Sequence, residues 1–154
     1  MMCGRKTLTR DIQSIIEELS IDEWNGKNFQ PNYNITPSQN SPVLIEENNS
    51  RVVKSMQWGL VPQWAKQKSI GAKMINARAE TILEKPSYQN LILQNRCVII
   101  ADGYYEWQRN NNSSSQPHYI FHPEKKLLPM AGLWTSWTSS INQIINSYTV
   151  ITTT

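Results

Sequence analysis

The chain has 154 residues, of which 39% are hydrophobic and 18% charged, and it contains six Trp and six Tyr. This aromatic content excludes a disordered chain, and a single domain of this length buries about 68–70% of its unfolded surface. The chain has only two cysteines, which excludes a disulfide framework. No apolar run approaches the ~20 residues that a membrane span needs. The net charge of +3 permits a nucleic-acid partner without requiring one.

The first five residues, Met1-Met2-Cys3-Gly4-Arg5, place a cysteine almost at the terminus. Removal of both methionines would give Cys3 a free α-amine beside its thiol, with reference pKa values of about 7.7–8.0 and about 8.5. Such an amine condenses with an aldehyde to an imine, and the thiol then closes onto the imine carbon to form a thiazolidine. Taken alone, the early position of Cys3 is explained more simply as an accident of where translation starts.

The next segment predicts a helix and then a hairpin. Ile12, Ile15, Ile16 and Leu19 follow the helical spacing i, i+3, i+4 and i+7, so we expect a scaffold helix over residues 9–20. Residues 6–20 also mix charged with apolar positions, so they do not resemble a cleavable signal, and we expect a reducing, cytoplasmic setting. Residues 43–46 and 51–57 flank a turn-forming Asn-Asn-Ser sequence and predict two paired strands.

Two tryptophans enclose a segment that contains Gly59 and Pro62, a composition typical of a rigid loop. We interpret Trp58 as a core residue. Trp64 is followed by two lysines and is the better candidate for exposure, where an indole can stack on a nucleobase.

Residues 73–77 predict a short strand that leads into a helix over residues 79–85. At their junction Asn76 is suited to bind a substrate hydroxyl, and the forked guanidinium of Arg78 is suited to bind a phosphate. The simpler alternative is an N-capping amide followed by a local ion pair between Arg78 and Glu80.

A second helix over residues 87–94 should precede a buried strand over residues 97–101, with Cys97 as a small core residue. Glu106 follows between Tyr105 and Trp107. Desolvation there would raise the pKa of the carboxyl group and suit it to proton transfer. Alternation along a strand would instead point this carboxylate into water.

The polar tract at 109–116 predicts a hairpin loop, and strands should follow at 118–121 and 128–134. We interpret His118 and His122 as surface residues of an edge strand, because neither has a metal-ligand spacing with a cysteine. Residues 147–154 are β-rich to the last residue. Because the sequence ends in what looks like a central strand, we expect a domain that is truncated at its C-terminus.

Five segments occur together in an order that is more specific than any one of them. They are Met2-Cys3-Gly4-Arg5, Tyr33-Asn34-Ile35-Thr36-Pro37, Trp58-Gly59-Leu60-Val61-Pro62-Gln63-Trp64, Ile75-Asn76-Ala77-Arg78-Ala79-Glu80-Thr81 and Ala101-Asp102-Gly103-Tyr104-Tyr105-Glu106-Trp107. Together they closely resemble the SRAP family (SOS response-associated peptidase), and the resemblance extends over the strands at 130–134 and 148–153.

The resemblance implies an α+β fold with a mixed β-barrel-like sheet flanked by helices. Residues 1–154 would form one domain, equivalent to the N-terminal two-thirds of the family domain. It also implies a monomer without cofactor, metal or membrane association. Its setting would be the cytoplasm at the nucleoid in a bacterium, or the nucleus in a eukaryote.

The implied activity is a DNA damage response in which the N-terminal cysteine forms a thiazolidine crosslink with abasic sites in single-stranded DNA. Cys3 would be the nucleophile, Glu106 the proton shuttle, and Asn76 the group that positions the amine or the opened sugar. Imine formation suits this set, because it needs an acid to expel water and a base to free the amine.

The resemblance also implies a DNA-binding surface. Arg5 and Arg78 would bind phosphates that flank the lesion, and Trp64 would pack against the bases. Asn34 and Pro37 belong to the same expected surface. These phosphate contacts would make binding sensitive to salt.

Two departures from the family pattern affect the expected chemistry. The catalytic histidine of the family lies in a His-x-Arg-Met-Pro segment after the strand that residues 147–153 resemble, and the sequence stops before it. The doubled methionine means that initiation at Met2, or autoprocessing, is needed to free Cys3. Two other readings therefore stay open: a thiol peptidase that uses Cys3 and Glu106, and a non-catalytic DNA-binding remnant.

Overall fold

The computed structural model describes residues 3–109 and 115–154 and consists mainly of strands with a few short helices. The elements are β1 (Lys6–Leu8), α1 (Ile12–Leu19), β2 (Glu23–Asn25), β3 (Asn32–Ile35), β4 (Asn40–Glu47), β5 (Ser50–Trp58), η1 (Lys68–Lys73), β6 (Asn76–Arg78), η2 (Ala79–Glu84), α2 (Leu91–Gln94), β7 (Arg96–Ile99), β8 (Gly103–Arg109), β9 (Ser115–Phe121), β10 (Met130–Thr138) and β11 (Ile144–Thr152). The predicted α+β class is confirmed. Among the described residues, no helix is long and apolar enough to cross a membrane.

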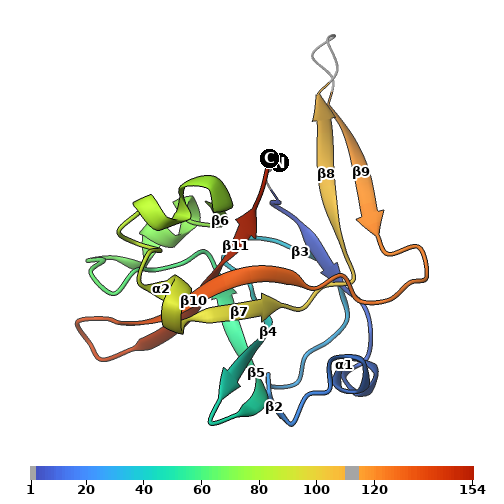
Figure 1. Cartoon of the computed structure of the whole chain (residues 1–154), viewed down its shortest axis with the longest axis horizontal. Coiled ribbons are helices and arrows are strands. Elements are labelled where there is room, and N and C mark those ends of the chain that lie inside the picture. The colour runs from blue at the N-terminus through green and yellow to red at the C-terminus, as the bar shows by residue number, and fades with distance from the viewer. Residues whose placement is uncertain (1–2, 110–114) are drawn as a thin grey trace.

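A closed barrel forms the centre of the molecule (Figure 1). The strands β5, β4, β7, β10 and β11 pair in this order, each antiparallel to the next. Parallel pairing of β11 with β5, at Ser147 with Gln57 and at Tyr148 with Trp58, then closes the ring. The strands β2 and β6 extend it on the outside, each parallel to its neighbour. The mixed, barrel-like sheet expected from the resemblance is therefore present.

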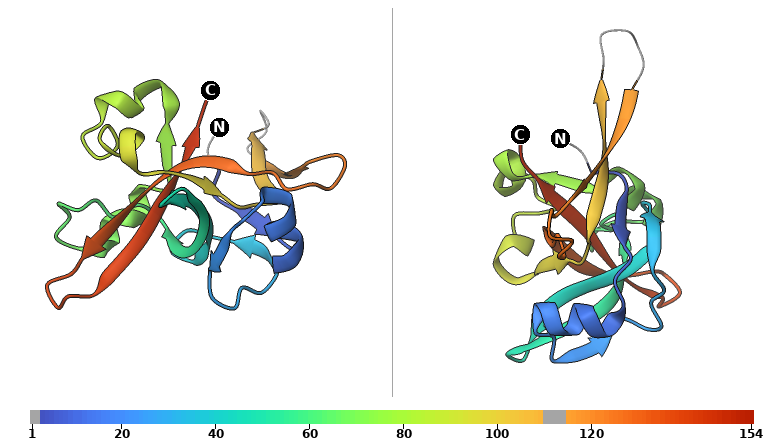
Figure 2. Two further views of the ribbon diagram at one scale, coloured as in Figure 1. Left: turned by 60° about the horizontal axis from the view of Figure 1, so that its bottom comes forward. Right: turned by 90° about the vertical axis from the view of Figure 1, so that its right-hand side faces the viewer.

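A second sheet, in the order β3-β1-β8-β9, stands beside the barrel. Its β8–β9 hairpin projects from the body of the molecule, close to where the chain begins and ends (Figures 1 and 2). The strand β9 is an edge, as predicted from the sequence. The predicted loop at 109–116 falls mostly outside the described residues.

The barrel interior combines aromatic packing with a buried polar strip. The rings of Trp58 and Tyr148 stack with their centroids 6.2 Å apart, and both side chains are fully buried. The Tyr148 hydroxyl lies 2.9 Å from the Ser41 hydroxyl, which also accepts a hydrogen bond from the Lys6 ammonium at 3.1 Å. Lys6 is fully buried as well, and its second acceptor is the carbonyl of Ile100. The prediction that Trp58 belongs to the core is confirmed.

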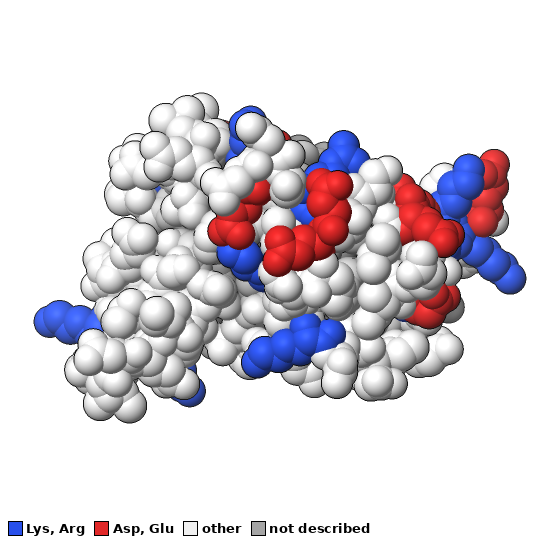
Figure 3. Space-filling view, turned by 90° about the horizontal axis from the view of Figure 1, so that it is seen from below, with Lys and Arg blue, Asp and Glu red and all other residues white. Residues whose placement is uncertain are grey.

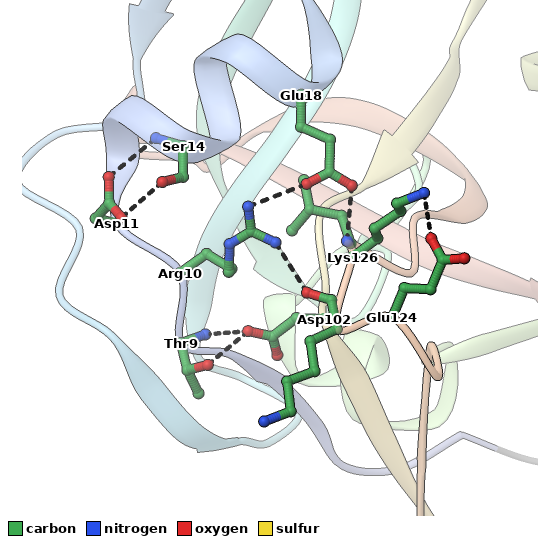
Figure 4. Close-up of polar contacts among 10 residues, drawn as sticks. Thr9, Arg10, Asp11, Ser14, Glu18, Asp102, Glu124 and Lys126 are labelled. Carbon is green, nitrogen blue, oxygen red and sulfur yellow. Dashed lines mark hydrogen bonds and ion pairs between the residues drawn. The ribbon is translucent and has the colours of Figure 1, made fainter.

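The first helix agrees with the sequence. Its N-cap is Asp11, whose carboxylate accepts hydrogen bonds from the backbone and hydroxyl of Ser14 (Figure 4). Its C-cap is Ser20, in the left-handed conformation, and its buried residue is Ile15. The β4–β5 hairpin is also as expected, because Asn48 and Asn49 both take the positive φ that a tight two-residue turn requires.

The segment between β5 and β7 differs from the prediction. The helix predicted over 79–85 is present as a 3₁₀ helix over residues 79–84, and the helix predicted over 87–94 is reduced to the single turn of α2. Pro86 ends η2, because the residue before a proline is restricted to extended conformations and Lys85 is extended. The polar residues 87–90, Ser-Tyr-Gln-Asn, form a turn, as Ser and Asn side chains favour by competing for backbone hydrogen bonds.

Candidate functional site

Cys3 lies three residues before the start of β1 and is buried, with 4% of its surface exposed. It lines a cavity of about 220 Å³ at the place where the second sheet meets the barrel. The other walls are Tyr104 from β8, Met130 from β10, and residues 150–154 at the end of β11. The cavity therefore joins the start of the chain to the last barrel strand.

Asn76 holds the backbone of Cys3. Its side-chain amide nitrogen donates a hydrogen bond of 3.0 Å to the Cys3 carbonyl. The parallel pairing of β6 with β11 places it there, with Asn76 opposite Val150. The side-chain oxygen of Asn76 is buried and has no hydrogen-bond partner within the described part of the chain. An unpaired buried acceptor is costly, so this oxygen is suited to bind an N–H or O–H group that enters the site.

The alternative of a capping amide at this junction is wrong, whereas the charge of Arg78 does act on Glu80. The N-cap of η2 is Arg78 and not Asn76, and no side chain caps the helix. Glu80 accepts hydrogen bonds from the backbone and hydroxyl of Thr154. Those bonds hold the pKa of the Glu80 carboxyl below its usual value.

Glu106 reaches the site from β8. It lies two positions from Tyr104, so both side chains point to the same face of the strand, towards Cys3. The residue belongs to an alternating strand and is half-buried. One of its carboxylate oxygens is buried and lacks a hydrogen-bond partner among the residues that the structure describes.

Burial dominates the electrostatics of the thiol. It raises the pKa of Cys3 to about 11, and the charge of Glu106 adds to the rise. A hydrogen bond from the thiol to the Arg5 carbonyl and the charge of Lys6 oppose it. At neutral pH the thiol is therefore protonated, and its attack on a carbon needs a base to accept the proton.

Arg5 directly precedes β1 and is exposed. Its guanidinium donates a hydrogen bond of 3.0 Å to the side-chain oxygen of Asn34 and lies 5.9 Å from the centre of the Trp107 ring. Pro37 follows β3 and is half-buried. The structure thus joins Arg5 and Asn34, two residues predicted to bind DNA.

Trp64 and Arg78 are exposed, as their predicted roles require, and neither is among the residues that line the Cys3 cavity. Trp64 is 63% exposed, and it borders an open depression of about 630 Å³ together with Lys66 and Lys73. Arg78 ends β6, opposite Thr152 of β11. The structure groups Cys3, Asn76 and Glu106 closely, whereas the predicted DNA contacts are spread around them.

Two residues of the site are absent from the sequence predictions. Tyr104 lines the cavity, and burial, followed by the charges of Cys3 and Glu106, raises the pKa of its hydroxyl. The alternation Tyr104, Tyr105, Glu106 could have revealed it, because residues two apart share a face. Lys6 acts on Cys3 from the barrel interior, and no sequence pattern signals a buried lysine.

The histidines occupy the positions expected of surface residues. His118 is exposed on β9, and His122 is half-buried just beyond that strand. The ring of His122 accepts a hydrogen bond from the backbone of Glu124. Within residues 3–109 and 115–154, no group of three or more His, Cys, Asp or Glu side chains is arranged to hold a metal ion.

Comparison with known proteins identifies the family. The family model "SOS response associated peptidase (SRAP)" matches residues 2–154. Abasic site processing protein YoaM of Bacillus subtilis is 40% identical, and the alignment covers 99% of this chain and 67% of that protein. Abasic site processing protein HMCES of Xenopus tropicalis is 34% identical over 98% of this chain and 57% of its own length.

Solved structures show the same fold. A crystal structure of a Bacteroides thetaiotaomicron protein superposes with a TM-score of 0.87 at 23% identity, covering 98% of this chain and 68% of that one. A Bordetella bronchiseptica protein gives a TM-score of 0.81 at 20% identity, covering 98% and 72%. On the sequence matches, the chain belongs to the SOS response associated peptidase (SRAP) family.

Proposed function

We propose that this protein binds single-stranded DNA and processes abasic sites by linking Cys3 covalently to the opened sugar. The observation that carries the proposal is the grouping of Asn76 and Glu106 around Cys3, because Asn76 donates a hydrogen bond to the Cys3 carbonyl and the charge of Glu106 acts on the Cys3 thiol. The names of the curated relatives, which are abasic site processing proteins, support the choice of lesion. The compartment would be the one that holds the DNA, the cytoplasm of a bacterium or the nucleus of a eukaryote.

The reaction begins once the residues before Cys3 have been removed. The α-amine adds to the aldehyde carbon of the ring-opened abasic sugar and gives a carbinolamine, which loses one water to form an imine. The thiol sulfur then adds to the imine carbon, its proton leaves to a base, and the nitrogen gains a proton. One C–N and one C–S bond have formed, one water has left, and no oxidant is needed.

Each polar group has a defined task in these steps. The free oxygen of Asn76 accepts a hydrogen bond from the amine and orients it. The Glu106 carboxyl donates a proton to the departing hydroxyl, and as a carboxylate it then accepts the thiol proton. A thiol with a pKa of about 11 depends on such a base near neutral pH.

The DNA would run along the end of the molecule that holds the termini and the projecting hairpin. Arg5 and Arg78 are exposed at this end and would bind phosphates, and Trp64 would stack on a base. Acidic side chains are grouped on the opposite end, interspersed with Lys and Arg side chains, as Figure 3 shows. They belong to α1, β2 and the β4–β5 hairpin, and this distribution would keep DNA away from that end.

A denaturing gel tests the proposal directly. The chain, with Cys3 verified by mass as its first residue, is incubated with an oligonucleotide that carries one abasic site. We expect a shifted band that Cys3→Ala abolishes and Cys97→Ala, at the buried second cysteine, preserves. No band from the verified chain would contradict crosslinking. Salt-dependent binding that Cys3→Ala leaves unchanged would then identify a non-catalytic DNA-binding protein.

A second candidate function is cleavage of the peptide bond before Cys3. It is favoured by the position of the Cys3 thiol within the electrostatic influence of Glu106, an arrangement that pairs a nucleophile with a base. Intact mass of the wild type and of Cys3→Ala distinguishes this activity from trimming by other enzymes. Equal loss of Met1 and Met2 from both proteins would exclude self-cleavage.

A further inference from the structure

The second sheet carries exposed aromatic side chains that the reaction at Cys3 does not use. Among the described residues, the exposed aromatic side chains are Tyr33, Trp64, Trp107, Tyr119 and Phe121. Four of these five belong to β3, β8 and β9, in the sheet β3-β1-β8-β9. An exposed group of this kind on one sheet indicates a binding surface.

Three rings on one face of the β8–β9 hairpin, those of Tyr105, Tyr119 and Phe121, form a continuous row. The Tyr105 and Tyr119 ring centres are 5.1 Å apart, and those of Tyr119 and Phe121 are 5.4 Å apart. The strand register explains the row, because Tyr105 lies opposite Tyr119, and Phe121 lies opposite Gly103. A β-carbon on Gly103 would be 2.4 Å from the Tyr119 hydroxyl, so the Tyr119 side chain lies across the strand at this glycine.

Hydrogen bonds hold the centre of the row in place. The Tyr119 hydroxyl is 2.9 Å from the hydroxyl of Thr7, which donates a hydrogen bond of 2.5 Å to Asp102. The other oxygen of Asp102 accepts from the backbone and hydroxyl of Thr9 (Figure 4). Both oxygens of this buried carboxylate are therefore occupied, and the aromatic row is preorganised.

Cations flank the row at both ends. At one end the Arg5 guanidinium lies over Trp107, which alternates with Tyr105 along β8. At the other end a cavity of about 360 Å³ is lined by Thr9, Arg10, Asp102, Tyr119, Phe121 and Lys125. Arg10 is tied to Glu18 at 3.2 Å, whereas Lys125 is exposed. Aromatic faces between cations are the arrangement that binds unpaired bases along a phosphate backbone.

We propose that this face, the stacking platform formed by Arg5, Trp107, Tyr105, Tyr119 and Phe121, binds unpaired bases of the DNA strand on one side of the abasic site. The inference rests on the proposed function, since it concerns the same DNA strand. Arg5 connects the two regions, because it is two residues from Cys3 and its side chain already belongs to the platform. β8 carries Glu106 on the face towards Cys3, and Tyr105 and Trp107 on the other face.

Fluorescence anisotropy with undamaged single-stranded oligonucleotides of increasing length tests the platform. Phe121→Leu keeps an apolar side chain but removes the ring, so we expect it to weaken binding of long strands at least about fivefold. Phe121→Trp should restore wild-type affinity because it restores the ring. Leu93→Ala, at an exposed aliphatic residue on α2, is the matched control and should leave affinity unchanged.

The outcomes separate this inference from the proposed function. Equal affinity of Phe121→Leu and the wild type for long strands would overturn the platform, whatever the crosslinking gel shows. Self-association in sedimentation that Phe121→Leu abolishes, together with unchanged DNA affinity, would identify a protein interface and also overturn it. Ring-dependent binding of long strands without a crosslink to abasic DNA would support the platform and contradict the reaction at Cys3.

Discussion

At the scale of single residues, the nitrogen and the oxygen of the Asn76 side-chain amide have different roles. The nitrogen fixes the Cys3 carbonyl, while the oxygen stays available in a buried site. Asn76→Asp keeps the shape but replaces the donor with an oxygen that faces the carbonyl. We expect crosslinking to slow by about tenfold, because the variant cannot donate this hydrogen bond and its oxygen repels the carbonyl.

The rate of band formation on a denaturing gel measures the effect of Asn76→Asp. Asn90→Asp adds the same charge at an exposed position that caps no helix through its side chain, so it should keep the wild-type rate. A wild-type rate for Asn76→Asp would show that the amide does not position Cys3.

Lys6 provides a prediction about pH. Burial lowers the pKa of its ammonium from 10.5 to about 7, although the charges of Cys3 and Asp102 act in the opposite direction. Between pH 7 and 10.5 the unfolded chain holds a proton that the folded chain has released, so this residue makes stability rise with pH. Below pH 7 the buried charge opposes folding.

Lys6→Met should therefore raise the melting temperature at pH 6 and lose this advantage by pH 10. At high pH the variant also lacks the hydrogen bond to the Ile100 carbonyl, which is worth about 1 kcal/mol. Thermal unfolding across this range measures the difference, with Lys54→Met as the partly exposed control. A constant difference between Lys6→Met and the wild type at every pH would contradict a buried, titrating lysine.

At the scale of elements, periodic sequence patterns predicted the local elements well, but the sequence did not predict how distant segments are placed. The helix at 12–19 and the β4–β5 hairpin follow from local spacing and from two asparagines that accept positive φ. Residues 79–84 carry no comparable pattern, and they form a 3₁₀ helix directly after β6. Local signals therefore identify strands and turns more reliably than short helices between them.

The same limit applies to the site. Cys3 and Glu106 are recognisable from their sequence motifs, and the exposure of Trp64 follows from its polar neighbours. The hydrogen bond from Asn76 to Cys3 depends on parallel pairing of β6 with β11, which no local pattern encodes. The burial of Lys6 contradicts the usual exposure of lysine, and only the assembled barrel supplies its acceptors.

Gly59, directly after β5, gives a prediction at this scale. Its φ is +113°, and a β-carbon there would lie 2.5 Å from the Gly71 carbonyl oxygen. Gly59→Ala should therefore cost roughly 2–3 kcal/mol of unfolding free energy, through backbone strain and a clash with main chain. Chemical denaturation measures this cost. Gly4→Ala is the control, because a β-carbon on Gly4 would meet no atom within 4 Å.

At the scale of the whole molecule, a modest net charge of +3 conceals an uneven distribution. Carboxylates gather at the end formed by α1, β2 and the β4–β5 hairpin (Figure 3), whereas Arg5 precedes β1 and Arg78 ends β6. Single-stranded DNA binding should therefore weaken steeply with salt. Arg5→Gln with Arg78→Gln should reduce the logarithmic salt slope by roughly 0.7 for each phosphate that the variant no longer neutralises.

Affinities measured at several salt concentrations give this slope. Lys54→Gln removes a cation that is paired with Glu47 on the acidic end, so it should leave the slope unchanged. Equal slopes for the double variant and the wild type would show that these arginines bind no phosphates.

The parallel pairing that closes the barrel also bears on how the chain reaches its native state. Gln57 and Trp58 on β5 meet Ser147 and Tyr148 on β11, about 90 positions later, whereas β4 and β5 meet across a two-residue turn. Closing so long a loop costs conformational entropy before the two strands can pair, so refolding should take milliseconds to seconds. The β4–β5 hairpin should form early, and burial of Trp58 against Tyr148 should report the final step.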